Sequence, residues 1–521
     1  MKQKTTFLIY LIFALLTVSV SAQTVNIEGD PYGGNPYASI TAAIDASNDG
    51  DVILIDGIHT EPITIFNKSI TLRGSDPTTD IIQAANSAAS DGSGQRVISI
   101  LASSVDPDPL PVLNVTIENL GVRYGNEPSV ANENHNGGGI DADKITGLLT
   151  LKNLIIEDNY TAELGGGLSI AGSNADIIEC TIRNNSCAKS GGGIILAPNN
   201  GAGINSTINF KQSLIDSNTG VSGGGIYING NPDFGDDYTI DVNIENSTIS
   251  NNSATSGQFG AGGGAIWTKG ATWTTNAGGD GSSGNVTLKL IHNTIFNNIH
   301  TGTLVRSGVR FTGTATSFSA FNSIIVAFDD TTRGALDFAN SNTTNVINCI
   351  LGTVNAAPAI VGDAGNNNQI GSSATDAGLT GTLTSDGGST QVIPLAMSSM
   401  AVDYCTVATG ETIPTIDQRG YGRTDGTNDA GAYEYGATTL SIADNEFDNG
   451  LKLFPNPARE FVTISSLKKI KQVKVYSILG VLENTFYDQN ELNISGLSKG
   501  VHLLSIEADD SSRSTRRLIV Y

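Results

Sequence analysis

Aromatic side chains are the first residues in this chain whose type and spacing could support binding. They fall within residues 227–273 and comprise Tyr227, Phe234, Tyr238, Trp267 and Trp273. Aromatic rings carry large apolar faces that stack on ring-shaped ligands. Rings gathered on one surface would form a binding platform, whereas rings scattered over loops would only cover backbone. Which of these alternatives holds depends on the strands and loops that position the rings.

Glycine triplets mark those elements. Five triplets begin at Gly137, Gly165, Gly191, Gly223 and Gly262, at intervals of 28, 26, 32 and 39 residues. A recurrence of this kind indicates a structural repeat whose units stack on one another. A glycine-rich run can instead cradle phosphate, but that requires a helix N-terminus directly after it. Each triplet here precedes strand-like sequence, so we interpret the triplets as turns of a coil.

The strand sequences between the triplets also repeat. One position of each repeat is aliphatic: Val122, Ile156, Ile182, Ile215, Ile249, Ile295, Ile325 and Leu351. Neighbouring coils lie about 4.8 Å apart, so these side chains must stack inside. Three residues earlier stands a polar column dominated by Asn, which we expect to form a hydrogen-bonded ladder. Three residues later stand five Asn residues that suit left-handed corners: Asn159, Asn185, Asn218, Asn252 and Asn298.

The repeat also predicts where the aromatic residues lie. Tyr227 and Trp267 fall on strands, and Phe234, Tyr238 and Trp273 fall in the two longest loops that follow them. Loops at the same point of successive coils project from one side of a solenoid. We therefore expect the five rings to form a ridge, with coverage of loop backbone as the alternative.

The sequence before the repeats resembles the opening of pectin-lyase-like right-handed β-helix proteins. Residues 37–46 have helical spacing, and Val52-Ile53-Leu54-Ile55 and later short β-branched runs read as strands. The element from Gly57 to Glu61 is similar to one seen in pectinesterases, where it marks the fold. The resemblance implies an all-β fold: a right-handed parallel β-helix solenoid over residues 23–390 with a helix over its first coil.

Length and composition agree with an exported solenoid. The chain has 521 residues, 61 of them Gly, and a formal net charge of −23. Residues 437–521 hold as many basic as acidic residues, so the acidic excess lies in the β-helical part, which should repel nucleic acid. Residues 1–22 have a basic start, an apolar core from Phe7 to Val20 and small residues at the end. We interpret them as a secretory signal peptide; the apolar run is short for a transmembrane helix, and no other segment could span a membrane as one.

Four cysteines allow three disulfide connectivities in an oxidising compartment: Cys180, Cys187, Cys349 and Cys405. Cys180 and Cys187 are the favoured local pair because a turn at Asn184-Asn185 lies between them. Their spacing does not suggest a metal site.

The C-terminal part of the chain divides into three segments. Residues 391–436 end in Asp429-Ala430-Gly431-Ala432-Tyr433-Glu434, which resembles a choice-of-anchor-type segment, and we expect them to close the last coil. Residues 437–450 read as an acidic linker. Residues 451–521 alternate in short runs that predict a small antiparallel β-sandwich. Phe454-Pro455-Asn456-Pro457-Ala458 and the basic-apolar tail resemble the type A sorting domain of the type IX secretion system of Bacteroidetes. That resemblance implies a secreted or outer-membrane-attached protein handled by the type IX secretion machinery.

The β-helix resemblance raises the possibility of an enzyme that cleaves acidic polysaccharides. A lyase of that kind needs a basic residue to remove the proton next to a uronate carboxylate, commonly with Ca²⁺. Lys289 with Arg310, or Arg306, facing Asp241 and Glu245, is the set that neighbouring coils could offer. These residues could equally be solvated outward positions.

Other catalytic patterns are missing from the sequence. The set of two Asp and one Arg that pectinesterases use is not recognisable, and the five histidines appear isolated or part of a ladder. The favoured hypothesis is therefore a carbohydrate-binding or adhesive solenoid that needs no cofactor. A polysaccharide lyase or other carbohydrate-active enzyme, with a possible Ca²⁺, and a purely structural surface component are the alternatives.

Overall fold

The computed structural model describes residues 23–29, 32–102, 111–130, 135–198, 205–230, 238–255, 262–270, 284–301, 307–313, 316–327, 334–338, 343–355, 364–423, 426–437, 451–466, 468–477, 481–509 and 513–521. The signal peptide expected at residues 1–22 lies outside them. The chain divides into two compact units, Met1–Ala437 and Thr438–Tyr521. The first unit is called the body below, and the second the C-terminal unit.

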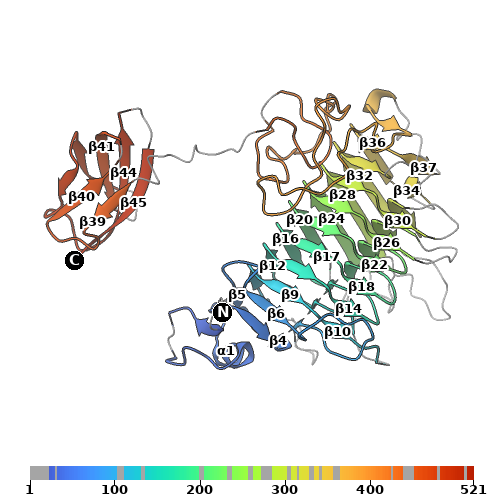
Figure 1. Ribbon diagram of the computed structural model, residues 1–521, viewed down its shortest axis with the longest axis horizontal. Coiled ribbons are helices and arrows are strands. Elements are labelled where there is room, and N and C mark those ends of the chain that lie inside the picture. Colours follow the sequence, from blue (N-terminus) through green and yellow to red (C-terminus); the bar gives the residue numbers. More distant parts are fainter. Residues whose placement is uncertain are drawn as a thin grey trace, which may run out of the picture. The chain divides into compact units, whose positions relative to one another are not determined.

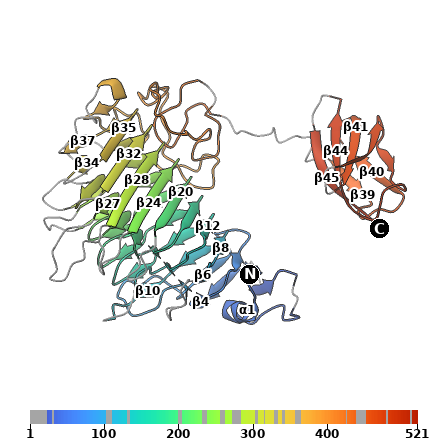
Figure 2. The same ribbon diagram turned by 180° about the vertical axis from the view of Figure 1, so that it is seen from behind.

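The body is a parallel β-helix built from three long sheets, as the sequence predicts (Figures 1 and 2). Sheet A consists, among the described residues, of β1 (Thr24–Ile27), β2 (Val52–Asp56), β5 (Thr71–Arg73), β8 (Val115–Glu118), β12 (Leu149–Lys152), β16 (Ala175–Ile178), β20 (Ser206–Lys211), β24 (Tyr238–Glu245), β28 (Gly284–Ile291), β32 (Thr316–Phe321) and β35 (Thr343–Ile347). Only β1 pairs antiparallel, with β2.

Sheet B follows sheet A in each coil. Its described strands are β3 (Ile58–Thr60), β6 (Ile81–Gln83), β9 (Gly121–Arg123), β13 (Ile155–Glu157), β17 (Thr181–Arg183), β21 (Leu214–Asp216), β25 (Thr248–Ser250), β29 (Thr294–Phe296), β33 (Ile324–Val326), β36 (Ile350–Leu351) and β38 (Gln369–Ile370). The short 3-10 helix η2 (Ala364–Asn366) precedes the last of them.

Sheet C completes the coil. Its described strands are β4 (Ile63–Phe66), β7 (Ile98–Leu101), β11 (Ile140–Asp143), β15 (Leu168–Ala171), β19 (Ile194–Ala197), β23 (Ile226–Asn229), β27 (Ile266–Lys269), β31 (Val309–Thr312), β34 (Gly334–Phe338) and β37 (Thr353–Asn355). Two-residue strands between sheets B and C form a small fourth sheet: β10 (Asn126–Glu127), β14 (Tyr160–Thr161), β18 (Ser186–Cys187), β22 (Thr219–Gly220), β26 (Ser253–Ala254) and β30 (Ile299–His300).

The helix α1 (Ile40–Ala46) covers the first coil and buries Ile40, Ala43 and Ile44. Ser39 caps its N-terminus by accepting from the backbone N–H of Ala42. Glu61 accepts a hydrogen bond of 2.7 Å from the N–H of Ile40. The carboxylate of the Gly57–Glu61 element therefore stabilises the helix N-terminus, which is a structural role.

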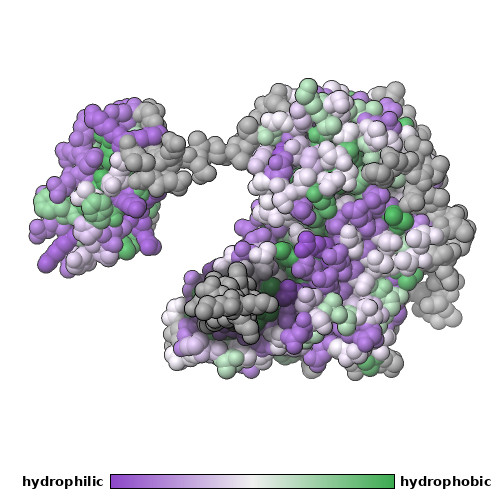
Figure 3. Space-filling model, in the orientation of Figure 1, coloured by the Kyte–Doolittle hydropathy of each residue, from purple (hydrophilic) through white to green (hydrophobic). Residues whose placement is uncertain are grey.

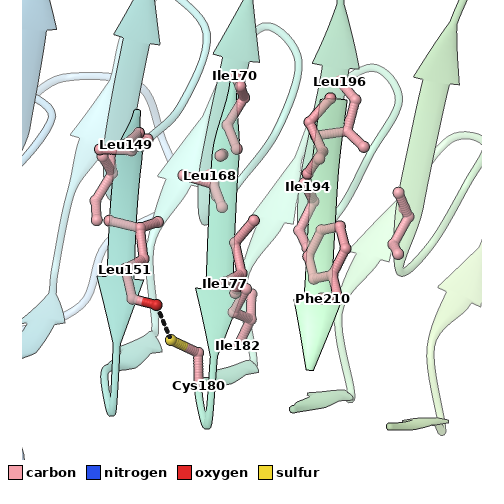
Figure 4. Close-up of a cluster of buried hydrophobic side chains, with 14 of the residues drawn as sticks. Leu149, Leu151, Leu168, Ile170, Ile177, Cys180, Ile182, Ile194, Leu196 and Phe210 are labelled. Atoms are coloured by element: carbon pink, nitrogen blue, oxygen red, sulfur yellow. Dashed lines mark hydrogen bonds between the residues drawn. The ribbon is translucent and has the colours of Figure 1, made fainter. Parts of the chain in front are cut away.

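The interior is a continuous stack of aliphatic side chains (Figure 4). The predicted aliphatic column, from Val122 to Leu351, is at most 1% exposed at every coil. Inward residues of sheets A and C pack against it, as Leu149, Leu151, Leu168 and Ile170 do in one part of the stack. This confirms the periodic pattern read from the sequence.

The earlier polar column contains the predicted amide hydrogen bonds, from Asn153 to Asn119 and from Asn348 to Asn322, each at 2.9 Å, and it also supplies a left-handed corner. Residues of the earlier column, such as Asn119 and Asn153, have positive φ and form the corner between sheets A and B. Asn159, Asn185, Asn218, Asn252 and Asn298 are instead buried in an unbroken ladder, each amide donating to the next at 2.9 to 3.0 Å. The left-handed corner there falls one residue earlier, for example at Asp158 and Asn184. An inward amide replaces backbone partners that the corner loses, which explains why the side chains of the later column point inward.

Residues 372–436, called the side segment, pack along the outer face of sheet B and not over the last coil. Outward residues of sheet B such as Phe296 and Ile324 share a core with Ala377, Ile393 and Leu395 of this segment. Hydrogen bonds run from Thr390 to the backbone of Gln212 and from the Asn246 amide to the backbone of Ile416. We expected residues 391–436 to close the last coil; the contacts above place them along the outer face of sheet B, whose apolar side chains they cover.

The C-terminal unit is a small antiparallel β-sandwich. One sheet contains β39 (Lys452–Phe454), β40 (Phe461–Ser465) and β43 (Glu491–Asn493). The other contains β42 (Leu482–Tyr487), β41 (Ile470–Ser477), β44 (Gly500–Ala508) and β45 (Arg513–Val520), in that order. A separate apolar core lies between them. Within the described parts of the chain, no helix is long and apolar enough to cross a membrane.

Candidate functional site

The outer face of sheet C carries the residues best suited to binding or catalysis. Its strands alternate, so that Ile140 and Ala142 enter the core while Asp141 between them points outward. The parallel register stacks the outward residues into one column: Ser99, Asp141, Ser169, Ile195, Tyr227, Trp267, Arg310 and Asp337.

Four ionisable side chains meet at one end of this column. The Arg96 guanidinium donates to the carboxylates of Asp141 and Glu127, the latter at 3.1 Å. Glu127 also accepts from the backbone N–H of Arg96 at 2.7 Å and lies 2.6 Å from Nδ1 of His135. Arg96, which precedes β7, therefore holds two acids of the next coil, and Glu127 orients the histidine.

Asp141 is the most perturbed member of this cluster. Its side chain is 1% exposed, and its Oδ1 has no hydrogen-bond partner. Burial raises the pKa of the Asp141 carboxyl, and the charge of Arg96 opposes that rise without cancelling it. A buried carboxyl that retains its proton more readily can donate it, which is a property of general acids.

A groove of about 580 Å³ opens beside the cluster. Arg96, Glu127 and His135 line it together with Thr64 and Ser99 of sheet C. The side chains of the three ionisable residues retain 9% to 13% of their exposure, so they face the groove from a mostly buried position. We call this the sheet C groove.

Two of the predicted aromatic residues come together on the same face. The rings of Tyr227 and Trp267 stack with centroids 4.6 Å apart and an interplanar angle of 18°. The Trp267 indole donates to the Thr312 hydroxyl at 2.9 Å. In the register, Arg310 occupies the next position beyond Trp267. Tyr227 is 5% exposed and Trp267 is partly exposed, so little of the Tyr227 ring is free to contact a sugar.

The other three aromatic residues of the predicted ridge do not join this stack among the described residues. Tyr238 begins β24 and points into the core, where it is 5% exposed, so its predicted place on a surface ridge is wrong. The alternation of β24 puts it on the inward side. Phe234 and Trp273 lie outside the described residues.

The structure does not assemble the lyase set. Lys289 lies on sheet A and pairs with Glu411 of the side segment at 3.0 Å. Arg310 lies on sheet C, is buried and pairs with Asp337 at 3.1 Å. Asp241 and Glu245 share sheet A with Lys289, so Arg310 is separated from all three, and Arg306 lies outside the described residues.

Cys180 and Cys187 do not form the predicted disulfide. Cys180 belongs to the interior at the corner between sheets A and B, and its thiol donates to the Leu151 carbonyl (Figure 4). The Ile178 carbonyl lies at a similar distance from the thiol. Cys187 ends β18 in the small fourth sheet. The strand β17 separates the two positions within the coil, so a local turn cannot bring the sulfur atoms together.

Sequence reasoning missed the sheet C groove. His135 looks isolated in the sequence because its partner Glu127 lies eight residues earlier, and Glu127 is in turn bound by Arg96 of the preceding coil. One signal was available: Asp141 is an acid in the short strand after a glycine triplet, where the other repeats place Ser, Ile, Tyr or Trp. Within the described ranges, no group of three His, Cys, Asp or Glu side chains is placed so that it could hold a metal ion.

Comparison with known proteins identifies the C-terminal unit. Residues 452–521 match the family described as "Secretion system C-terminal sorting domain". The unit is a type IX sorting domain. It marks the protein as secreted or attached to the cell surface, and as a client of the secretion machinery. No curated protein sequence matches the chain.

Solved structures similar to this chain include two pectin methylesterases and a pectate lyase. The pectin methylesterase from Yersinia enterocolitica has 16% identity and a TM-score of 0.29, covering 51% of this chain and 81% of that one. The pectate lyase Pel9A has 16% identity and a TM-score of 0.35, covering 77% and 92%. The pectin methylesterase from carrot has 12% identity and a TM-score of 0.23, covering 66% and 88%.

Proposed function

We propose that the protein is an exported surface β-helix that binds polysaccharide in the sheet C groove. The observation that carries the proposal is the convergence of Arg96, Glu127 and His135 on an open groove on the solenoid's outer face. Sugar hydroxyls donate and accept hydrogen bonds, and fixed charged groups form stronger hydrogen bonds than neutral ones. An open groove along stacked coils suits a polymer better than a small molecule, which needs an enclosing pocket.

The charges in the groove favour a neutral polysaccharide. The positive charge of Arg96 is already matched by Glu127 and Asp141. Among the described lining residues, the groove therefore has no unmatched Lys or Arg to attract a polyuronate, and the body as a whole is acidic. This argues for a binder of uncharged glycan and against the acidic substrates that the β-helix resemblance implies.

A second candidate is a carbohydrate-active enzyme at the same groove. Asp141 favours it, since its pKa is raised and one of its buried oxygens has no partner. With His135 oriented by Glu127, the cluster would contain a proton donor and a base. In this role Asp141 would supply the proton, and Arg96 would hold its carboxyl in place.

A glycan array probed with the purified protein tests both candidates. Glu127→Gln and His135→Ala should each weaken retention of neutral glycans at least tenfold. Glu245→Gln, on the outer face of sheet A, is the matched control and should bind like the native protein. Equal binding by all three variants would contradict the groove as the binding site.

Turnover separates the enzyme from the binder. Bound glycans should be incubated with the protein, and release of reducing ends or unsaturated products measured. If the protein is an enzyme, Asp141→Asn should lose turnover and keep binding. No product from any bound glycan would leave binding as the function.

A further inference from the structure

The outer face of the four-stranded sheet in the sorting domain exposes apolar side chains. Leu482 is 50% exposed, and Val501 and Leu503 are each 40% exposed. Tyr476 and Ile519 of the same face are partly exposed. Figure 3 shows hydrophobic residues at the surface of this unit.

The register brings these residues together at one end of the sheet. Tyr476 pairs with Leu482 on one side and with Leu503 on the other. Val501 pairs with Ile519 on the last strand, and Leu503 pairs with the exposed Arg517. These five apolar residues, called the apolar end below, form one continuous surface. Contiguous exposed apolar surface on a small domain generally marks an interaction site.

The inward side chains fix this end in place. His502 lies between Val501 and Leu503 but is 2% exposed. It contacts the Glu483 carboxylate through Nδ1 and the Ser498 carbonyl, at 2.8 Å, through Nε2. The buried histidine thus ties β42 and the turn before β44 to the strand that presents the two exposed residues. The apolar end is therefore held in a defined shape.

The edge of the sheet beside β45 is already occupied. Ala458 donates to the Ile519 carbonyl at 2.8 Å, and the Asn456 side chain bonds to the carbonyl of Arg517 and the N–H of Ile519. The Phe454–Ala458 motif thus pairs with the last residues of the chain. A partner cannot add a strand at this part of the edge, so recognition there must use the side chains of the face.

We propose that the apolar end is the surface by which a protein of the secretion system holds the chain during export. The family of this domain names a secretion system as what handles it. The surface is bordered by Arg517, with Lys474 two residues from Tyr476 on β41. The partner should therefore present an apolar patch flanked by acidic residues.

Export of the full chain tests this assignment in a bacterium that carries this secretion system. Leu503→Asp and Leu482→Asp should each lower the amount on the surface and in the medium at least tenfold, with accumulation inside the cell. Arg517→Glu should reduce export several-fold. Phe461→Asp is the matched control: Phe461 is 47% exposed on the other sheet, and its substitution should change export less than twofold.

Two measurements keep the outcomes distinct. Each variant should be purified and its thermal unfolding compared with that of the native protein, so that lost export is interpreted only for folded chains. If Leu503→Asp does not fold, Leu482→Asp, on the edge strand, provides the test instead. Normal export of both folded variants would overturn the proposal. A native dimer by sedimentation velocity that Leu503→Asp dissociates, with export unchanged, would assign the surface to a second copy instead and would equally overturn it.

Discussion

Trp267 stacks on Tyr227 of the preceding coil, with ring centroids 4.6 Å apart. The two rings lie in a column that continues into Ile195 on one side and Arg310 on the other. In a β-helix, side chains at equal positions stack along the axis, so a ring is covered by its neighbours in the column. The main effect of aromatic residues in such a column is therefore on the stability of the stack and not on ligand binding.

Substitution of Trp267 should therefore affect stability more than binding. Trp267→Ala removes the stack and the hydrogen bond to Thr312 and should cost about 3 kcal/mol of unfolding free energy. Denaturant unfolding of the body measures this. Glycan retention should stay within twofold of native; abolished retention with unchanged stability would instead make Trp267 a ligand platform.

Substitution in the buried Asn ladder should reduce stability far more than substitution in the partly buried Asn column on the outer face of sheet A. Asn218 accepts from the side chain and the backbone of Asn185 and donates to Asn252 and to the carbonyl of Ile182. Asn218→Ala leaves these groups unsatisfied and should cost about 3 kcal/mol or more.

Asn209 on the outer face of sheet A is the control for the ladder. It bonds to Asp176 and Asn243 in an equivalent column but is only partly buried. Asn209→Ala should cost less than about 1 kcal/mol, because water replaces the lost partners. Equal losses in the two variants would show that burial is not what makes the inner ladder important.

The pair formed by Arg423 and Glu434 should hold the side segment in place. Both side chains are fully buried, and Arg423 also bonds to Asn246 of the solenoid at 3.1 Å. Arg423→Ala leaves a buried carboxylate without its partner and should cost about 3 to 5 kcal/mol. The more exposed pair of Arg183 with Glu157, whose side chains are 37% and 20% exposed, is the control, and Arg183→Ala should cost about 1 kcal/mol at most.

The lowered pKa of the Asp80 carboxyl predicts that the protein loses stability in acid. Burial alone would raise its pKa, but hydrogen bonds from Gly57, Ser75 and Asp76 outweigh that effect and lower it. A carboxyl with a lowered pKa stabilises the fold above its unfolded pKa of about 3.9 and loses that contribution as the pH falls through the folded value. Asp80→Asn should therefore reduce stability near pH 7 and flatten its decrease below pH 4. An unchanged acid profile would contradict the assignment.

The cysteines should remain thiols. Burial raises the pKa of Cys180 and of Cys187 to about 12, so neither forms a reactive thiolate near neutral pH. A thiol reagent should modify both only after unfolding, and mass spectrometry of the native exported protein should find no bond between them. A Cys180–Cys187 peptide in a non-reduced digest would contradict this.

The sequence determined the solenoid because its signals are local and repeated. The coils carry the same local signals: glycine triplets, residues of the aliphatic column from Val122 to Leu351 and short β-branched runs. Because the coils stack, the same pattern recurs along the chain and can be recognised. The sorting domain was equally readable, since the Phe454–Ala458 motif and the basic tail are specific. The structure explains why these two motifs occur together: Asn456 bonds to the backbone of the last strand.

Tertiary structure decided which residues face one another across coils. Arg96 lies one turn before Glu127 and Asp141, across segments whose length varies between coils, so their meeting depends on register, which no local pattern states. For the same reason the sequence predicted Tyr238 on the surface, whereas the alternation of its strand turns it inward. It also predicted that Lys289 and Arg310 would lie together, whereas they lie on different sheets. Loop length sets the register, and the register decides which side chains become neighbours.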